Sequence, residues 1–183
     1  MLWKTVSLLV LIFIIYYNTM TQPINSKAKD TVLQTCGMTS GWIEKTKKVL
    51  RHDEDIRYKP YRDSVGKLTI GVGRNLDDVG ISDMTVDQML EEDICKAVSS
   101  AKAIFGGQFD TMTPLRQIAI VNMLFNLGEP RFKRFVMTIA AIKRNDFKSA
   151  KDHALHSRWA KQVGARAQRV VSMLEDNKDI YPS

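Results

Sequence analysis

Apolar residues follow two different spacings along the chain, and each spacing predicts a different kind of element. In residues 40 to 54 apolar side chains recur seven apart, as in Trp42 and Val49, which predicts an amphipathic helix beginning at an N-cap serine. Residues 57 to 81 hold short alternations of apolar and polar positions between Pro and Gly residues, which predicts strands and turns. From residue 82 onward the helical period prevails, so this part is expected to be helical.

The helical part carries recognisable start and stop signals. Residues 85 to 88 resemble a capping box, Thr113-Pro114 is an N-cap followed by Pro at the first helical position, and Gly128 marks a helix end. Residues 118 to 127 are apolar nearly all round and predict a buried central helix. Further helices are expected over 132–139, over 147–155 with Asp146 as cap, and over 166–174. These patterns predict an α+β fold, with a small β-rich N-terminal lobe, a larger helical C-terminal lobe and a cleft between them.

The first residues of the chain differ from the rest in composition. Residues 6 to 17 form an apolar run in which only Ser7 is polar, and Lys4 precedes it. Such a run is typical of an export signal or a signal anchor that engages the membrane or the export machinery. We therefore expect a signal or anchor segment over 1–21, a polar linker over 22–40 and one domain over 41–183. The expected location is secreted, periplasmic or membrane-tethered through residues 2–17, with cleavage left open.

Composition narrows the partners only a little. The formal net charge of +7 at pH 7 favours an anionic partner such as a nucleic acid, a membrane surface or a bacterial wall, although a basic surface also simply keeps a protein soluble. No GxGxxG or GxxxxGK[ST] motif supports a nucleotide cofactor, and no Cys/His cluster has metal-binding spacing. No motif typical of DNA or RNA binding is present. We expect no cofactor, no metal and no nucleic-acid partner.

An acidic cluster, Asp53-Glu54-Asp55, closes the first predicted helix. Successive helical residues point about 100° apart, so only one of the three can face a given cleft. Acids at a helix C-terminus oppose the macrodipole and repel each other, and both effects favour the protonated form that a general acid needs. The alternative is an exposed acidic turn, and spacing alone does not exclude it.

A second carboxylate, Asp63, lies nine residues after Glu54, just before the turn glycine Gly66. On the strand that follows, Leu68, Ile70 and Val72 are expected on one face, which leaves the Thr69 hydroxyl on the other. Two carboxylates on different elements fit acid/base cleavage of a glycosidic bond. Asp63 is also a common turn residue and Thr69 a common strand former, so these structural roles stay open.

The stretch LRHDEDIRYKPYRDSVGKLTIGVG resembles the catalytic region of the phage-type (T-even) lysozymes. The resemblance lies in the spacing Glu-x8-Asp-x5-Thr followed by Ile-Gly-x-Gly, and it continues in AIVNMLFNLGE, SRW and ARAQRV, over about residues 42 to 176. It implies an N-acetylmuramidase that cleaves the β-1,4 bond between N-acetylmuramic acid and N-acetylglucosamine in peptidoglycan. Glu54 is then the general acid, Asp63 the second carboxylate, and Thr69 helps to hold the attacking water in an inverting reaction.

The resemblance also assigns residues of the helical lobe. Arg166 matches the arginine that approaches the catalytic Glu, and Phe125, Thr138 and His153 match positions that line the sugar-binding cleft, although ordinary packing or a solvated surface explains these three equally well. Arg74 stands where the family commonly has His, which puts only the ion pair of that His in doubt. A monomer that acts on the anionic bacterial wall is expected.

Two alternatives to a muramidase stay open: a lytic transglycosylase, against which Asp63 argues, and a catalytically silent glycan-binding module. In an exported protein Cys36 and Cys95 either form a disulfide or remain two unrelated thiols.

Overall fold

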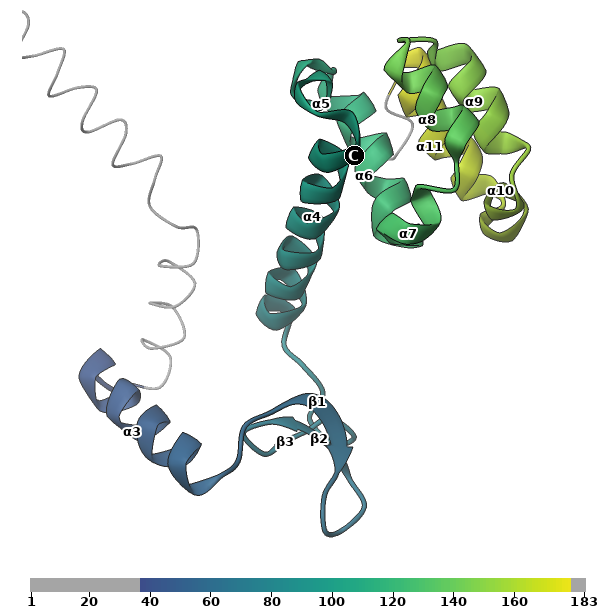
Figure 1. Cartoon of the computed structure of the whole chain (residues 1–183). Helices are drawn as coiled ribbons and strands as arrows, with labels where there is room; N and C mark the ends of the chain where they lie inside the picture. Colours follow the sequence, from purple (N-terminus) through teal and green to yellow (C-terminus); the bar gives the residue numbers. More distant parts are fainter. Residues whose placement is uncertain (1–36, 179–183) are drawn as a thin grey trace, which may run out of the picture. The chain divides into compact units, whose positions relative to one another are not determined.

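The computed structural model describes residues 37–178, which form two compact units that divide between Met84 and Thr85 (Figure 1). The first unit contains α3 (Ser40–Asp53), β1 (Arg57–Arg62), β2 (Leu68–Gly71) and β3 (Arg74–Asn75). The second unit is helical and contains α4 (Asp83–Phe105, which begins just before the division), α5 (Gly107–Thr111), α6 (Pro114–Leu127), α7 (Glu129–Phe132), α8 (Val136–Lys143), α9 (Phe147–Leu155), α10 (Arg158–Val163) and α11 (Ala165–Asp176). The predicted α+β class, mostly helical with a small sheet near the N-terminus, is confirmed.

The N-cap of helix α3 is Thr39, one residue before the predicted cap, and the helix begins at Ser40. The Thr39 hydroxyl, not that of Ser40, accepts a hydrogen bond from the Trp42 N–H at 3.3 Å. The helix ends where the acidic cluster predicts, because the Glu54 N–H donates to the Leu50 carbonyl at 2.8 Å while the Glu54 backbone is extended. No residue of α3 is buried, and its apolar stripe, with Trp42 and Leu50 about half exposed, stays largely accessible.

The three strands form an antiparallel sheet in the order β1-β2-β3. Tyr61 pairs with Thr69, and an irregularity in β1 lies between Arg57 and Tyr61, where Pro60 lacks the N–H that a regular ladder needs. Strand β2 ends at Gly71, so Val72 lies beyond the strand on which it was expected. Thr69 is the buried residue of this sheet, at 3% exposure.

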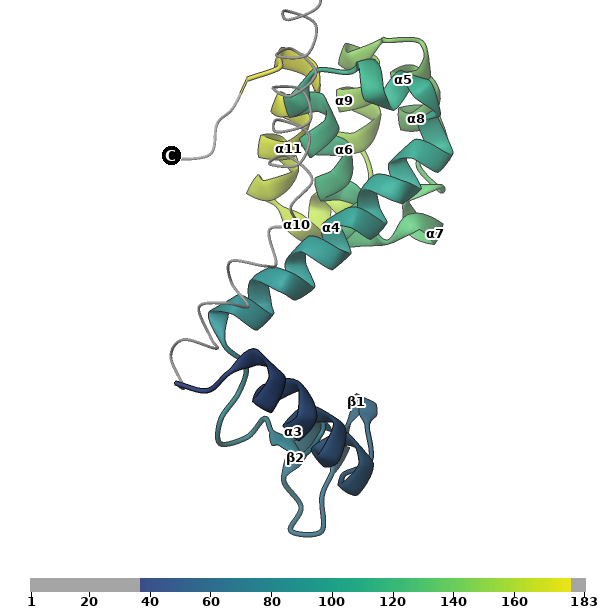
Figure 2. The same ribbon diagram turned by 90° about the vertical axis from the view of Figure 1, so that its left-hand side faces the viewer.

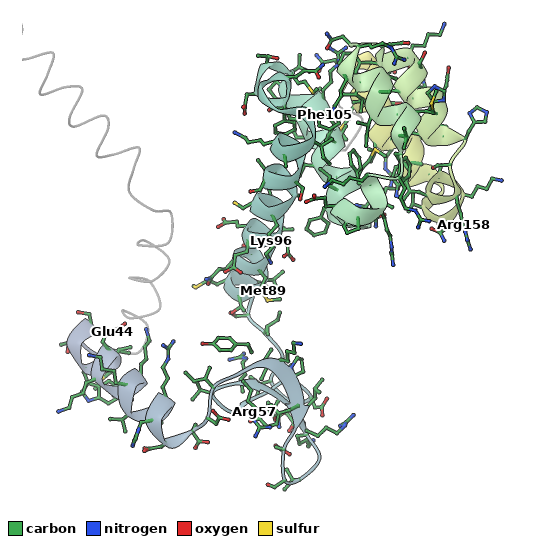
Figure 3. The ribbon with its side chains drawn as sticks, viewed as in Figure 1. Glu44, Arg57, Met89, Lys96, Phe105 and Arg158 are labelled. Carbon is green, nitrogen blue, oxygen red and sulfur yellow. The ribbon has the colours of Figure 1, made fainter. Side chains whose placement is uncertain are left out.

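The core of the helical unit surrounds α6, as its apolar sequence predicts. Helix α11 packs on α6 and α9, and α8 packs on α9 (Figure 2). The largest fully buried apolar side chains are Phe132, Ile120, Met123, Ile142, Met173, Leu174, Val170 and Val171. Helix α4 contributes to the core mainly through its C-terminal half: Phe105 is buried, whereas Met89 and Lys96 are exposed (Figure 3).

Several helix boundaries differ from the predicted ones. Thr85 lies inside α4, which begins at Asp83, so the capping-box prediction of the start was wrong. The helix expected over 132–139 is divided into α7 and α8, because Phe135 has a non-helical backbone (φ −81°, ψ 53°). The break lets two neighbouring aromatic side chains pack inward, with the Phe132 and Phe135 rings stacked at 6.3 Å. The short helices α5 and α10 were not predicted.

Predictions for the N-terminal segment and for Cys36 fall on residues outside the described range of 37–178. Within that range no helix combines the length and the apolar composition needed to cross a bilayer. Cys95, on α4, is an exposed free thiol.

Candidate active site

Glu54 lies at the junction between α3 and β1. Its backbone N–H closes the last turn of the helix, and its extended φ and ψ (−105°, 124°) lead the chain toward the sheet. The side chain is exposed and follows Asp53, which is exposed as well. The junction therefore presents the Glu54 carboxyl to solvent from a backbone fixed by the helix end.

Asp63 organises the hairpin loop between β1 and β2. Its Oδ1 accepts two backbone N–H groups, from Val65 at 3.0 Å and from Lys67 at 2.8 Å. Its own N–H donates to the Lys67 carbonyl at 3.0 Å, and its carbonyl accepts from the Gly66 N–H at 3.0 Å. Gly66 has φ +84°, a conformation that residues with a side chain rarely adopt. Asp63 therefore has the structural role in the turn that the sequence left open, and its Oδ1 atom fulfils it by accepting these backbone hydrogen bonds.

The other carboxylate oxygen of Asp63 faces Thr69. The Thr69 hydroxyl lies 3.4 Å from Asp63 Oδ2 and 3.2 Å from the Lys67 carbonyl, so its single proton has two candidate acceptors. Because backbone donors already engage Oδ1, Oδ2 is the oxygen with more free accepting capacity. The structure brings Asp63 and Thr69 together, as an arrangement that holds a water requires.

Further contacts fix the frame of this hairpin. The Arg62 guanidinium donates to the Gly66 carbonyl at 2.7 Å, and Asp77 Oδ2 accepts the Leu68 N–H at 2.8 Å. Lys67 pairs with Asp78 at 2.8 Å. Hydrogen bonds, not apolar packing, therefore set the position of Asp63.

In the helical unit, Arg166 and Phe125 line one groove of about 660 Å³. Arg166, half-buried near the start of α11, donates to Asn122 Oδ1 through Nε at 3.2 Å and through Nη2 at 2.9 Å. The groove walls are mainly apolar and come from α4 and α6, including Leu90, Ile94, Val98, Ile118 and Val121. Asn122 thus holds the arginine at the edge of an apolar groove.

Thr138 and His153 line a second groove of about 430 Å³. Thr138 lies on α8 and is buried, whereas His153 lies on α9 and is exposed. Trp159 forms one wall, fixed by its Nε1–H bond to Asn126 Oδ1 at 2.8 Å. The four residues assigned to the helical lobe therefore divide between two grooves, and the structure does not bring all four together.

Two residues that support these grooves, Asn122 and Asn126, were not among the predicted site residues. Both interrupt an otherwise apolar helix; Asn122 is half-buried and Asn126 is exposed, and polar side chains that leave solvent are usually hydrogen-bonded. This signal pointed to partners for both residues. The partners themselves, Arg166 for Asn122 and Trp159 for Asn126, are more than thirty positions away in the sequence and could not be named from it.

The sequence pattern of the family described as Phage lysozyme matches residues 51–176. The chain belongs to the Phage lysozyme family. The matched span begins three residues before Glu54 and contains all seven candidate residues. The resemblance drawn from the catalytic stretch is thereby confirmed at the level of the family.

Known proteins that are similar to this chain share about a quarter of their aligned residues with it. The chain is 24% identical over 161 residues to "Probable T4-type lysozyme 1" of Dictyostelium discoideum, covering 73% of this chain and 95% of that protein. It is 25% identical over 148 residues to the "SAR-endolysin" of Escherichia phage Mu, covering 79% of this chain and 83% of that protein. It is also 24% identical over 153 residues to the "Pre-baseplate central spike protein Gp5" of Enterobacteria phage T4, of which it covers 27%.

Proposed function

We propose that this chain is an N-acetylmuramidase that hydrolyses the β-1,4 bond between N-acetylmuramic acid and N-acetylglucosamine. Membership of the Phage lysozyme family implies a peptidoglycan hydrolase. The observation that carries the finer assignment is the Asp63–Thr69 pair in the hairpin that follows Glu54, with Asp63 Oδ2 and the Thr69 hydroxyl 3.4 Å apart.

In this proposal Glu54 is the general acid. It donates its proton to the glycosidic oxygen as the bond to the anomeric carbon breaks, so that the leaving sugar departs as a neutral alcohol. The exposed carboxyl at the end of α3 suits a donor that must reach a polymer in solution.

Asp63 and Thr69 act on the attacking water. Oδ2 of Asp63 accepts a proton from the water while the water oxygen bonds to the anomeric carbon, and the Thr69 hydroxyl helps to hold that water in place. The bonds from Val65 and Lys67 to Oδ1 keep the carboxylate in one orientation, so little reorganisation is needed during the reaction.

Replacement of the proposed acid tests the assignment. Glu54→Gln is expected to reduce release of reducing ends from purified peptidoglycan by about 10²–10⁴-fold, the usual contribution of a general acid. The thermal unfolding curve should change little, because the side chain is exposed. The matched control is Asp53→Asn in the same acidic cluster, which should clear peptidoglycan at nearly the parent rate.

The products released by the parent protein distinguish a muramidase from the two alternative functions. A muramidase leaves reducing N-acetylmuramic acid ends, whereas anhydro-muramic ends would identify a lytic transglycosylase. Binding to walls with no release of either end would identify a glycan-binding module. Undiminished clearing by Glu54→Gln would remove the assignment of Glu54.

A further inference from the structure

The turn that follows β3 holds the backbone of Leu68 at both of its polar groups. The Leu76 N–H donates to the Leu68 carbonyl at 2.7 Å, which continues the pairing of β2 with β3 by one residue. The Leu68 N–H donates to Asp77 Oδ2 at 2.8 Å. In a regular antiparallel ladder a backbone carbonyl would accept this N–H, so the side chain of Asp77 takes the place of a strand partner.

The peptide that Asp77 holds is the one on which the Asp63–Thr69 pair rests. The N–H of Leu68 and the carbonyl of Lys67 belong to a single planar peptide unit. At the other end of this unit, the Lys67 carbonyl accepts the Asp63 N–H at 3.0 Å and lies 3.2 Å from the Thr69 hydroxyl. Asp77 therefore fixes the plane of a peptide whose oxygen contacts both members of the pair.

The Thr69 hydroxyl has one proton to donate and two neighbouring acceptors. The Lys67 carbonyl is nearer, at 3.2 Å, than Asp63 Oδ2, at 3.4 Å. The negative charge of Asp63 attracts the proton toward Oδ2. The bond from Leu68 to Asp77 acts in the other direction, because a carboxylate at the N–H end of a peptide polarises it and makes its carbonyl a stronger acceptor.

We propose that Asp77 is a positioning residue of the hydrolytic reaction, which directs the Thr69 proton to the Lys67 carbonyl. The Thr69 oxygen and Asp63 Oδ2 are then both acceptors, one for each proton of the attacking water. With both protons engaged, the water presents a lone pair to the anomeric carbon. As the new oxygen–carbon bond forms, one water proton passes to Oδ2 and the leaving sugar oxygen takes the proton of Glu54. This inference rests on the proposed muramidase function.

Removal of the acceptor at Asp77 tests the inference on soluble, uncrosslinked peptidoglycan strands. Asp77→Ala should lower kcat about fivefold and leave KM within about twofold, because the proposed role concerns the attacking water and not the binding of the sugar. Asp77→Asn keeps an oxygen that can accept the Leu68 N–H, and it should restore kcat to within about twofold of the parent. Asp77 is exposed, so neither replacement removes packing from a core.

A double-mutant cycle separates this role from a general loosening of the turn. Thr69→Val removes the hydroxyl through which Asp77 acts in the proposal, and it should lower kcat by itself. Asp77→Ala added to Thr69→Val should then lower kcat by less than about twofold more, because groups that act through one network are not additive. A further loss of about fivefold in this background would overturn the proposal, since independent effects multiply.

Asp78→Ala is the control for the stability of the turn. Asp78 accepts a hydrogen bond from Lys67 Nζ at 2.8 Å and another from Asn75 Nδ2 at 2.9 Å, whereas the Leu68 N–H bonds to Asp77. Asp78→Ala should lower the unfolding temperature at least as much as Asp77→Ala does, with a smaller loss of kcat. Equal losses of kcat in the two alanine variants would overturn the role of Asp77.

The remaining outcomes distinguish this inference from the function on which it rests. A parent-like kcat in Asp77→Ala, with activity lost in Glu54→Gln, would overturn the inference and leave the muramidase proposal standing. A parent protein that releases no reducing ends would overturn both. If Asp77→Ala does not fold, Asp77→Ser replaces it, because the shorter side chain places its oxygen away from the Leu68 N–H, and the same fall in kcat is expected.

Discussion

The two units of this chain hold their candidate residues by different physical means. Among the described residues of the first unit only Thr69 is buried, and a set of turn and side-chain hydrogen bonds positions Asp63. The helical unit buries a continuous apolar core, on whose surface Arg166 and His153 lie. Directional hydrogen bonds fix the orientation of the Asp63 carboxylate, whereas burial of apolar side chains in the core supplies free energy of folding. We infer that the first unit mainly holds the candidate catalytic residues in position, and that the second unit contributes most of the free energy of folding.

The largest effect on stability is expected from a substitution in the core of the helical unit. Phe132 is fully buried, and its ring packs edge-on against Phe105 and stacks on Phe135. Phe132→Ala should lower the free energy of unfolding by about 3–5 kcal/mol, from lost burial and a cavity. Leu68→Ala, at a half-buried position of the sheet, should lower it by only about 1 kcal/mol. Denaturant unfolding measures both, and equal losses would contradict the division of roles.

The next largest effect is expected from a substitution of Asp63, the carboxylate that the hairpin of the first unit holds in place. Asp63→Asn keeps an oxygen that can accept the Val65 and Lys67 N–H groups but removes the charge at the Oδ2 position. Peptidoglycan hydrolysis should fall by about 10²–10³-fold with little change in the unfolding curve, because the turn survives and the proton acceptor does not. The matched control is Glu44→Gln, at an exposed position on α3 of the same unit, which should keep nearly the parent rate. A variant Asp63→Asn as active as the parent would exclude Asp63 from the reaction.

The sequence predicted those features that neighbouring residues determine. The end of α3 at the acidic cluster, Thr113-Pro114 at the start of α6, Gly128 at its end and Asp146 as the cap of α9 all follow from local backbone requirements. Asp146 Oδ1 accepts the Ser149 N–H at 3.1 Å, as an N-cap does. The family resemblance followed from the spacing Glu-x8-Asp-x5-Thr with the Ile-Gly-x-Gly that comes after it, and from further matching stretches in the helical part.

Features that depend on distant partners could not be predicted in this way. The division of the 132–139 helix at Phe135 accompanies packing of the Phe135 ring against Trp159 of α10, with the ring centroids 6.2 Å apart. The pairing of Arg166 with Asn122 joins α11 and α6, and the second groove is lined by residues from α7, α8, α9 and α10. The catalytic roles of Glu54, Asp63 and Thr69 stay predictions that the substitutions above test.

The smallest expected effect concerns a charged contact at the edge of the core. Glu129 accepts a hydrogen bond from Lys133 and another from the Ser100 hydroxyl of α4 at 2.7 Å. Lys133 first, and then Ser100, hold the pKa of Glu129 below its ordinary value of about 4.5. A carboxyl with a lowered folded-state pKa stabilises the fold above its unfolded pKa, and this contribution is lost as the pH falls through the folded value. Glu129→Gln should therefore unfold at a slightly lower temperature at pH 7.

This difference in unfolding temperature should shrink as the pH is lowered below about 4.5, because the parent also loses its charged contact there. Lys133→Gln removes the larger cause of the pKa shift and should reduce the pH dependence without abolishing it, since the Ser100 bond remains. Thermal melts of the three proteins from acid to neutral pH measure the effect. If the difference in unfolding temperature between Glu129→Gln and the parent instead grew as the pH was lowered, the charged contact would oppose folding. The helical unit would then gain no stability from the Glu129–Lys133 pair.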